Sequence, residues 1–238
     1  DNSLDNKVIA CVTANRYKAN RTPYEAFHDS KDGYNWAEIQ KRAKKLSYEQ
    51  QWRFSKDAMK KFEEKTVTTD LKYTGRIITL QVDDVLLPNG KQGKREIVKH
   101  PGAVAVIAVT DDKKIILVEQ YRKALERSII EIPAGKIEPN EAPELTAMRE
   151  LEEETGYTCN DLRYIQSFAT SPGFADEIIH LYLAENIVKM ENPADLDEDE
   201  FVELLHVSLE DMEQMVISQQ IFDAKTAFAY IWLKDYLK

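Results

Sequence analysis

Near the middle of the chain, several glutamates have a spacing that could hold a divalent metal ion. Glu153 and Glu154 follow Glu150 by three and four residues, so on a helix the three side chains project from one face. Like charges at this spacing repel each other, and clustered hard oxygen ligands suit Mg²⁺ or Mn²⁺. The usual alternative for such a run is a solvated acidic helix face. That alternative does not explain the position of Arg149 or of the glycines that flank the segment.

The segment that carries these glutamates has the composition of a helix, which we expect over residues 142–155. Pro143 suits the first turn, where a missing backbone N–H costs nothing. Gly156 follows at the position where a left-handed end is favourable. Four residues are expected to form the apolar stripe of this helix: Leu145, Ala147, Met148 and Leu151.

Around this helix the sequence predicts mostly strands. They are expected over residues 66–69, 76–82, 95–98, 102–110, 115–120, 129–135, 162–169, 177–184 and 204–207. Ser208 with Asp211 marks the start of one further helix, and another is expected over residues 223–237. The inward residues of that last helix are expected to be Ala224, Ala227, Phe228, Ile231 and Trp232. Strands followed by a central and a closing helix indicate an α+β sandwich.

Charge divides the chain of 238 residues into two parts. Residues 1–58 carry 11 Lys and Arg against 8 Asp and Glu, which leaves 21 against 34 for the rest. We expect an N-terminal extension of unknown role over residues 1–58, with a helix at 36–59, and one catalytic domain over residues 59–238. The net charge of −10 argues against nonspecific nucleic-acid binding. Two distant cysteines and no apolar run of membrane-spanning length lead us to expect a cytoplasmic protein.

The segment with the glutamates resembles the Nudix box of pyrophosphohydrolases. The pattern is G-x5-E-x7-R-E-U-x-E-E-x-G-U, where U is apolar, and residues 135–157 match every fixed position. Tyr157 stands where an aliphatic residue is usual, and an aromatic ring can also fill an apolar site. The resemblance implies a Nudix-type α/β/α sandwich of mixed sheets with a catalytic loop–helix–loop. It also implies metal-dependent hydrolysis of a diphosphate bond.

The resemblance implies roles for the charged residues of the box. Glu150, Glu153 and Glu154, with the backbone carbonyl of Ala134, would hold Mg²⁺, with Mn²⁺ as an alternative, and Glu153 would also act in catalysis. Arg149 would either pair with Glu141 or another carboxylate of the box, which we favour, or contact phosphate directly.

A general base is expected on the acidic loop over residues 195–200. Glu198 and Glu200 match the position of acidic residues that reach the metals and the attacking water in Nudix relatives. The choice between these two stays open, and a solvated loop is the alternative for the segment.

Residues outside the box resemble the ADP-ribose pyrophosphatase branch of the family. Pro172 lies sixteen positions after Gly156, and the stretches 95–102, 118–122, 131–135 and 171–177 look like that branch. The resemblance implies hydrolysis of ADP-ribose to AMP and ribose 5-phosphate. Two alternatives remain: hydrolysis of other nucleoside diphosphate sugars, and a non-catalytic sensor that binds ADP-ribose.

Five residues would bind the substrate by the same resemblance. Arg95 and Arg122 would contact the diphosphate or the adenine side, because a guanidinium fork matches phosphate oxygens. Glu96 and Glu177 would hydrogen-bond the base or ribose, and Phe174 would stack on a base or simply pack. Members of the branch are typically dimers that exchange N-terminal strands, so a homodimer is expected in which Arg95 and Glu96 serve the partner's site.

Overall fold

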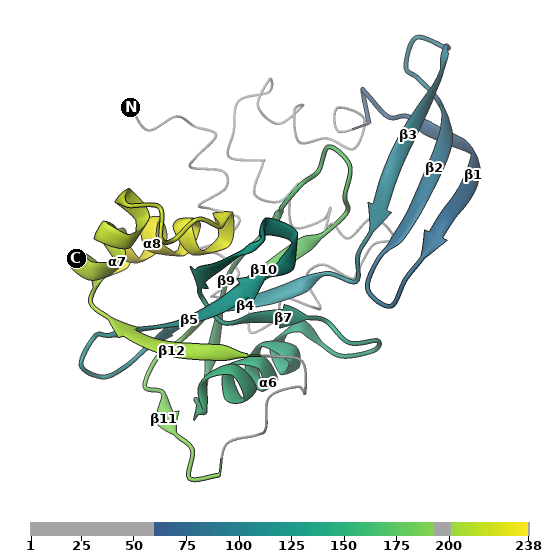
Figure 1. Ribbon diagram of the computed structural model, residues 1–238. Coiled ribbons are helices and arrows are strands. Elements are labelled where there is room, and N and C mark those ends of the chain that lie inside the picture. Colours follow the sequence, from purple (N-terminus) through teal and green to yellow (C-terminus); the bar gives the residue numbers. More distant parts are fainter. Residues whose placement is uncertain (1–59, 193–200, 238) are drawn as a thin grey trace, which may run out of the picture. The chain divides into compact units, whose positions relative to one another are not determined.

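The computed structural model describes residues 60–192 and 201–237. The chain divides into two compact units between His100 and Pro101 (Figure 1). The extension expected over residues 1–58 and its helix lie outside the described residues, so the boundary at residue 58 stays a prediction. In the parts of the chain that the structure describes, no helix has the length and apolar character needed to cross a membrane.

The first unit contains a three-stranded antiparallel sheet. Its strands are β1 (Lys65–Thr74), β2 (Thr79–Leu86) and β3 (Gln92–Lys99), in that order. The turn between β2 and β3 has Gly90 at φ 79° and a hydrogen bond from Leu87 N to Lys91 O of 2.8 Å. The strand predicted over residues 76–82 begins too early. Thr74 pairs with Thr79, so residues 75–78 form the turn that joins β1 to β2.

The second unit is built around a mixed sheet of seven strands. The strands are β4 (Ala103–Val109), β5 (Ile115–Arg122), β6 (Arg127–Glu131), β7 (Ala134–Lys136), β9 (Leu162–Ala169), β10 (Ile178–Ala184) and β12 (Val202–Val207). The order is β12-β5-β4-β10-β9, with β6 paired to β5 and β7 paired to β4. Strands β4 and β10 run parallel, and the other pairs are antiparallel. A separate pair consists of β8 (Tyr157–Thr158) and β11 (Val188–Lys189).

Helices cover both faces of this sheet (Figure 1). Helix α6 (Pro143–Thr155) lies on one face, and α7 (Leu209–Ile217) and α8 (Ala224–Tyr236) lie on the other. Every residue of β4 is buried, as expected of a strand that is covered on both sides. The expected α/β/α sandwich of mixed sheets is therefore confirmed.

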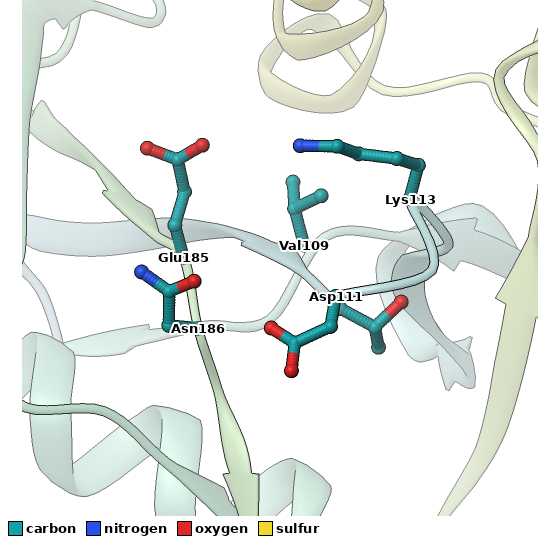
Figure 2. A pocket seen from close by; sticks show the side chains of 6 residues that line it. Val109, Asp111, Lys113, Glu185 and Asn186 are labelled. Carbon is teal, nitrogen blue, oxygen red and sulfur yellow. The ribbon is translucent and has the colours of Figure 1, made fainter.

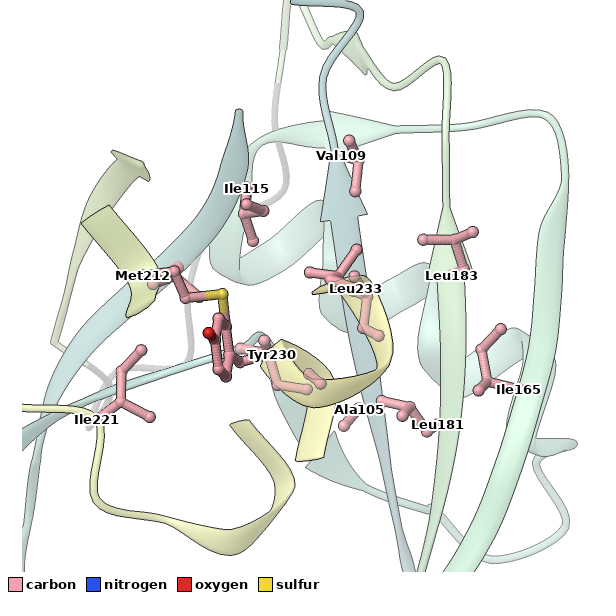
Figure 3. Packing of buried hydrophobic residues seen from close by; sticks show 14 of the residues in the cluster. Ala105, Val109, Ile115, Ile165, Leu181, Leu183, Met212, Ile221, Tyr230 and Leu233 are labelled. Carbon is pink, nitrogen blue, oxygen red and sulfur yellow. The ribbon is translucent and has the colours of Figure 1, made fainter. Parts of the chain in front are cut away.

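The main core fills the space between the sheet and helices α7 and α8. Figure 3 shows Met212 and Leu233 from these helices with Ile115 and Leu183 from the strands, all in one buried cluster. Helix α7 starts at the predicted capping box, because Ser208 Oγ accepts from Asp211 N at 3.1 Å and Asp211 Oδ2 accepts from Ser208 N at 3.1 Å. This core fixes the strands on which the candidate site is built.

Candidate active site

Helix α6 presents two glutamates, rather than a purely apolar stripe, to the interior. Glu150 is 7% exposed and Glu154 is 5% exposed, beside the fully buried Ala147 and Leu151. Leu145, which was expected in the apolar stripe, is 64% exposed, and that prediction is wrong. The helix ends as predicted at Gly156, whose φ is 69°. A buried carboxylate must be paired or hydrogen-bonded, so the partners of these two glutamates identify the site.

Gly135 of β7 makes room for the Glu150 carboxylate. A Cβ atom at residue 135 would lie 1.9 Å from both Cδ and Oε1 of Glu150. No real contact is that short, so any side chain at residue 135 would force the Glu150 carboxylate to move. The strand and the helix thus approach closely enough for the carboxylate to lie directly on the backbone of β7.

Glu154 is held by residues from two strands. Its Oε2 accepts a hydrogen bond from Ala134 N at 2.9 Å, and its Oε1 lies 3.5 Å from Nε2 of Gln120 on β5. Ala134, the expected backbone ligand, therefore lies beside Glu154. The contact of Gln120 was not predicted, although the residue lies in a stretch that carries the family resemblance.

Arg149 makes the predicted ion pair with Glu141 and joins two further carboxylates. Its Nη2 lies 3.2 Å from Glu141 Oε2, and its Nη1 lies 2.9 Å from Glu150 Oε1 and 2.8 Å from Glu153 Oε2. Burial alone would lower the pKa of Arg149, but the hydrogen bond of Glu141 and the charge of Glu150 outweigh it and raise that pKa. For Glu141, burial alone would raise the pKa. The hydrogen bonds from Arg149 and from the hydroxyl of Thr146 outweigh burial, so the pKa of Glu141 is lowered. Arg149 thus stays charged and balances the acidic cluster.

The donor chemistry of this cluster fits a divalent cation. Glu150, Glu153 and Glu154 supply hard carboxylate oxygens, the ligands that Mg²⁺ and Mn²⁺ prefer. Across residues 60–192 and 201–237, no three His, Cys, Asp or Glu side chains converge as metal ligands. Instead, Arg149 bridges Glu150 and Glu153. The metal-binding set therefore stays a prediction.

Arg122 lies near this cluster and is bound by an acidic residue that sequence reasoning missed. Its Nε and Nη2 bond the two oxygens of buried Glu131 at 2.6 and 3.0 Å. Lys225 of α8 also contacts Glu131. Sequence reasoning missed the pair of Glu131 with Lys225, which are 94 residues apart. The signal that could have indicated it is a glutamate within the otherwise apolar stretch at residues 129–132.

The other predicted substrate residues lie in different places. Phe174 is 58% exposed, and Glu177 accepts a hydrogen bond from Thr170. Arg95 and Glu96 lie on β3 of the first unit, where Arg95 pairs with Glu64. The candidate bases Glu198 and Glu200 lie outside the described residues, and their role stays a prediction.

A cavity of about 300 Å³ lies at the far end of strand β4 from this cluster. Figure 2 shows Asp111, Lys113, Glu185 and Asn186 around it, beside Val109 at the end of β4. The box residues instead contact β7, which pairs with Ala103–Ala105 at the start of β4. None of the predicted site residues therefore lines this cavity.

The sequence is similar to known families and proteins over the residues that form both sheets and the acidic cluster. A model of the NUDIX domain matches residues 99–227, and one of the nucleoside diphosphate sugar hydrolase N-terminal domain matches residues 64–98. The chain is 59% identical over 182 residues to the ADP-ribose pyrophosphatase of Bacillus subtilis, covering 76% of this chain and 98% of that relative. It is also 59% identical over 181 residues to the methanol dehydrogenase activator of Bacillus methanolicus, covering 75% and 98%.

A crystal structure of an ADP compounds hydrolase has the same fold. Its TM-score is 0.65 at 21% sequence identity, over 74% of this chain and 94% of that one. The family match covers more than half of the chain and includes the loop, helix and strands that position Glu150, Glu154 and Arg149. This chain belongs to the Nudix-domain family.

Proposed function

We propose that the protein hydrolyses the diphosphate bond of ADP-ribose, giving AMP and ribose 5-phosphate, with Mg²⁺ or Mn²⁺ as cofactor. The observation that carries the proposal is the close approach of buried Glu150 and Glu154 to Gly135 and Ala134. This approach occurs in a chain that matches 98% of the length of an ADP-ribose pyrophosphatase at 59% identity.

The charges of the site suit a diphosphate substrate. Glu150, Glu153 and Glu154 would hold the cation, which neutralises phosphate charge and lowers the pKa of a bound water. Arg122 would bind phosphate oxygens through its guanidinium group. The proton of the attacking water would pass to a carboxylate on the loop over residues 195–200, with Glu198 and Glu200 as the proposed bases.

Two other functions for the same site are supported by particular findings. The match of residues 64–98 to a nucleoside diphosphate sugar hydrolase domain supports other sugar nucleotides as substrates. The equal identity to a methanol dehydrogenase activator supports a role in activating a dehydrogenase. A sensor that binds ADP-ribose without cleaving it is the non-catalytic alternative.

We also propose a homodimer that exchanges N-terminal strands, as expected from the branch. Strand β1 supports it, since all ten of its residues are exposed. Val67, Leu71 and Tyr73 are large apolar side chains that are exposed along this strand. Light scattering of the purified protein tests this proposal, and a monomer at micromolar concentration would contradict it. Cys159 is a free, buried thiol, which supports a cytoplasmic location.

One assay tests the catalytic proposal directly. The full chain is incubated with ADP-ribose and a panel of nucleoside diphosphate sugars, with Mg²⁺, with Mn²⁺ and with EDTA, and AMP release is measured by chromatography. We expect ADP-ribose to give the highest kcat/KM and EDTA to abolish turnover. Binding of ADP-ribose without product would favour the sensor, and a higher kcat/KM for another sugar nucleotide would change the substrate. The same protein is added to a methanol dehydrogenase assay to test activation.

A further inference from the structure

The amino-terminal end of helix α8 is hydrogen-bonded to the short segment between β6 and β7. Thr226 Oγ1 accepts a hydrogen bond from Ile132 N at 3.0 Å. Asp223 caps the helix through its Oδ1, which accepts from Thr226 N at 3.1 Å and from Lys225 Nζ at 2.9 Å. The attachment lies two residues before Ala134, which bonds Glu154. Helix α8 thus contacts the backbone that borders the acidic cluster.

A buried carboxylate connects this helix to Arg122. Glu131, the last residue of β6, has a side chain only 2% exposed, and it lies between the cations of Arg122 and Lys225. Burial alone would raise the pKa of Glu131, but Arg122 and Lys225 outweigh it and lower that pKa. Glu131 is therefore ionised at neutral pH and holds both cations in fixed positions.

Arg122 lies within the electrostatic influence of the acidic cluster: burial alone would lower its pKa, but Glu131 and also the charge of Glu154 raise that pKa. Its side chain is 41% exposed, whereas that of Lys225 is 10% exposed, so only Arg122 is accessible to a substrate. Gln120 lies two residues earlier on the same face of β5 and contacts Glu154. Glu131 occupies the Nε and Nη2 edge of the guanidinium. The pair with Glu131 does not use the Nη1 group of Arg122.

We propose that Lys225 is a positioning residue. By sharing the carboxylate of Glu131, Lys225 fixes the guanidinium of Arg122 beside Glu154, where Arg122 binds the substrate's diphosphate. The inference rests on the proposed function, because it assigns Arg122 to the diphosphate. The charges of Arg122, Lys225, Glu131 and Asp223 cancel. Without Lys225 the remaining three carry one net negative charge, which would repel a diphosphate and leave Glu131 to neutralise Arg122 alone.

The test compares variants of Lys225 in steady-state kinetics with ADP-ribose and Mg²⁺. Lys225→Met removes the charge but keeps the length of the side chain. We expect KM to rise about tenfold, which corresponds to the lower end of the contribution of a hydrogen bond to a charged group. We expect kcat to change less than about threefold. Lys225→Arg should restore KM. Lys234→Met is the matched control on the same helix, since Lys234 pairs with Glu213 instead, and it should keep KM within about twofold.

A double variant separates positioning from a general structural role. Because Lys225 acts through Arg122, the pair Arg122→Met/Lys225→Met should have the KM of Arg122→Met alone. Two effects that multiply, or a folded Lys225→Met with unchanged KM, would overturn the proposal. If Lys225→Met does not fold, Lys225→Met/Glu131→Gln removes the buried charge together with its partner, and the same rise in KM is required. Absence of turnover by the wild-type chain would instead refute the proposed function and this inference with it.

Discussion

Replacing Gly135 with alanine tests whether the close approach of strand and helix is needed for activity. The new methyl group would lie 1.9 Å from Glu150 Oε1, and ordinary contact begins at 3.4 Å. The carboxylate must therefore retreat by about 1.5 Å. Metal ligands function within about 0.2 Å of their ideal distance, and a misplacement of about 1 Å can reduce a rate by about 100-fold. We expect Gly135→Ala to lower kcat/KM by about 100-fold or more.

Stability should change much less than activity. The atoms that must move are the end of a flexible side chain, and Arg149 can still neutralise the displaced carboxylate. Thermal unfolding of Gly135→Ala is therefore compared with that of Gly173→Ala. A Cβ at residue 173 would meet no described atom within 4 Å, so this control shows the effect of the added methyl group on the melting temperature alone.

Shortening Glu150 supplies the sharper test. Glu150→Asp removes one methylene and so draws the carboxylate back toward the helix. This shift is about as large as the one that the alanine methyl group at residue 135 would force. The double variant Gly135→Ala/Glu150→Asp should therefore be more active than Gly135→Ala. Glu150→Asp alone should reduce activity in the wild-type background. The reasoning is refuted if Gly135→Ala keeps kcat/KM within about threefold of wild type, or if the second substitution only adds to the loss.

Three further predictions follow from the same contacts. Glu153→Gln and Glu154→Gln should each lower kcat by at least about 100-fold and leave the circular dichroism spectrum unchanged. The reason is that loss of even an outer partner of a metal ligand lowers metal affinity or activity by about 10–100-fold. Unfolding of either variant would show that the cluster is structural. Glu131→Gln should lower the free energy of unfolding at pH 7 by about 3–5 kcal/mol, the cost of breaking a buried pair. The pKa of Glu131 is below its ordinary value of 4.5, so the contribution is complete above that pH, and urea titrations should show the difference from wild type shrinking as the pH falls below it. Removal of residues 1–58 should leave a folded, active protein, because relatives are matched over 98% of their length by about three quarters of this chain; loss of all activity would contradict the proposed boundary.

Local backbone chemistry made the catalytic helix predictable from sequence. Pro143 and Gly156 define its ends through the properties of their own backbone, and both stand where they were expected. The Arg149–Glu141 pair was predictable for a similar reason, because both residues belong to one short motif. The strand limits were less accurate at residues 75–78, where pairing between β1 and β2 places a turn.

Contacts between distant residues could not be predicted in the same way. Apolar periodicity placed Ala224 and Ile231 inside, yet both are exposed, and the buried positions of α8 include Thr226. The buried Thr226 accepts a hydrogen bond from Ile132, a contact that hydrophobicity does not represent. The same limit explains why Leu145 was placed inside while two glutamates occupy the buried face of α6.

The guanidinium of Arg149, which lies among three carboxylates, has a consequence for how the protein matures. An internal counter-ion relieves the repulsion that would otherwise oppose formation of the catalytic helix. The helix can therefore reach its folded position with Arg149 as its counter-ion. On the proposed function, a divalent cation would replace Arg149 beside Glu150 and Glu153, and the helix would not have to refold to accept it.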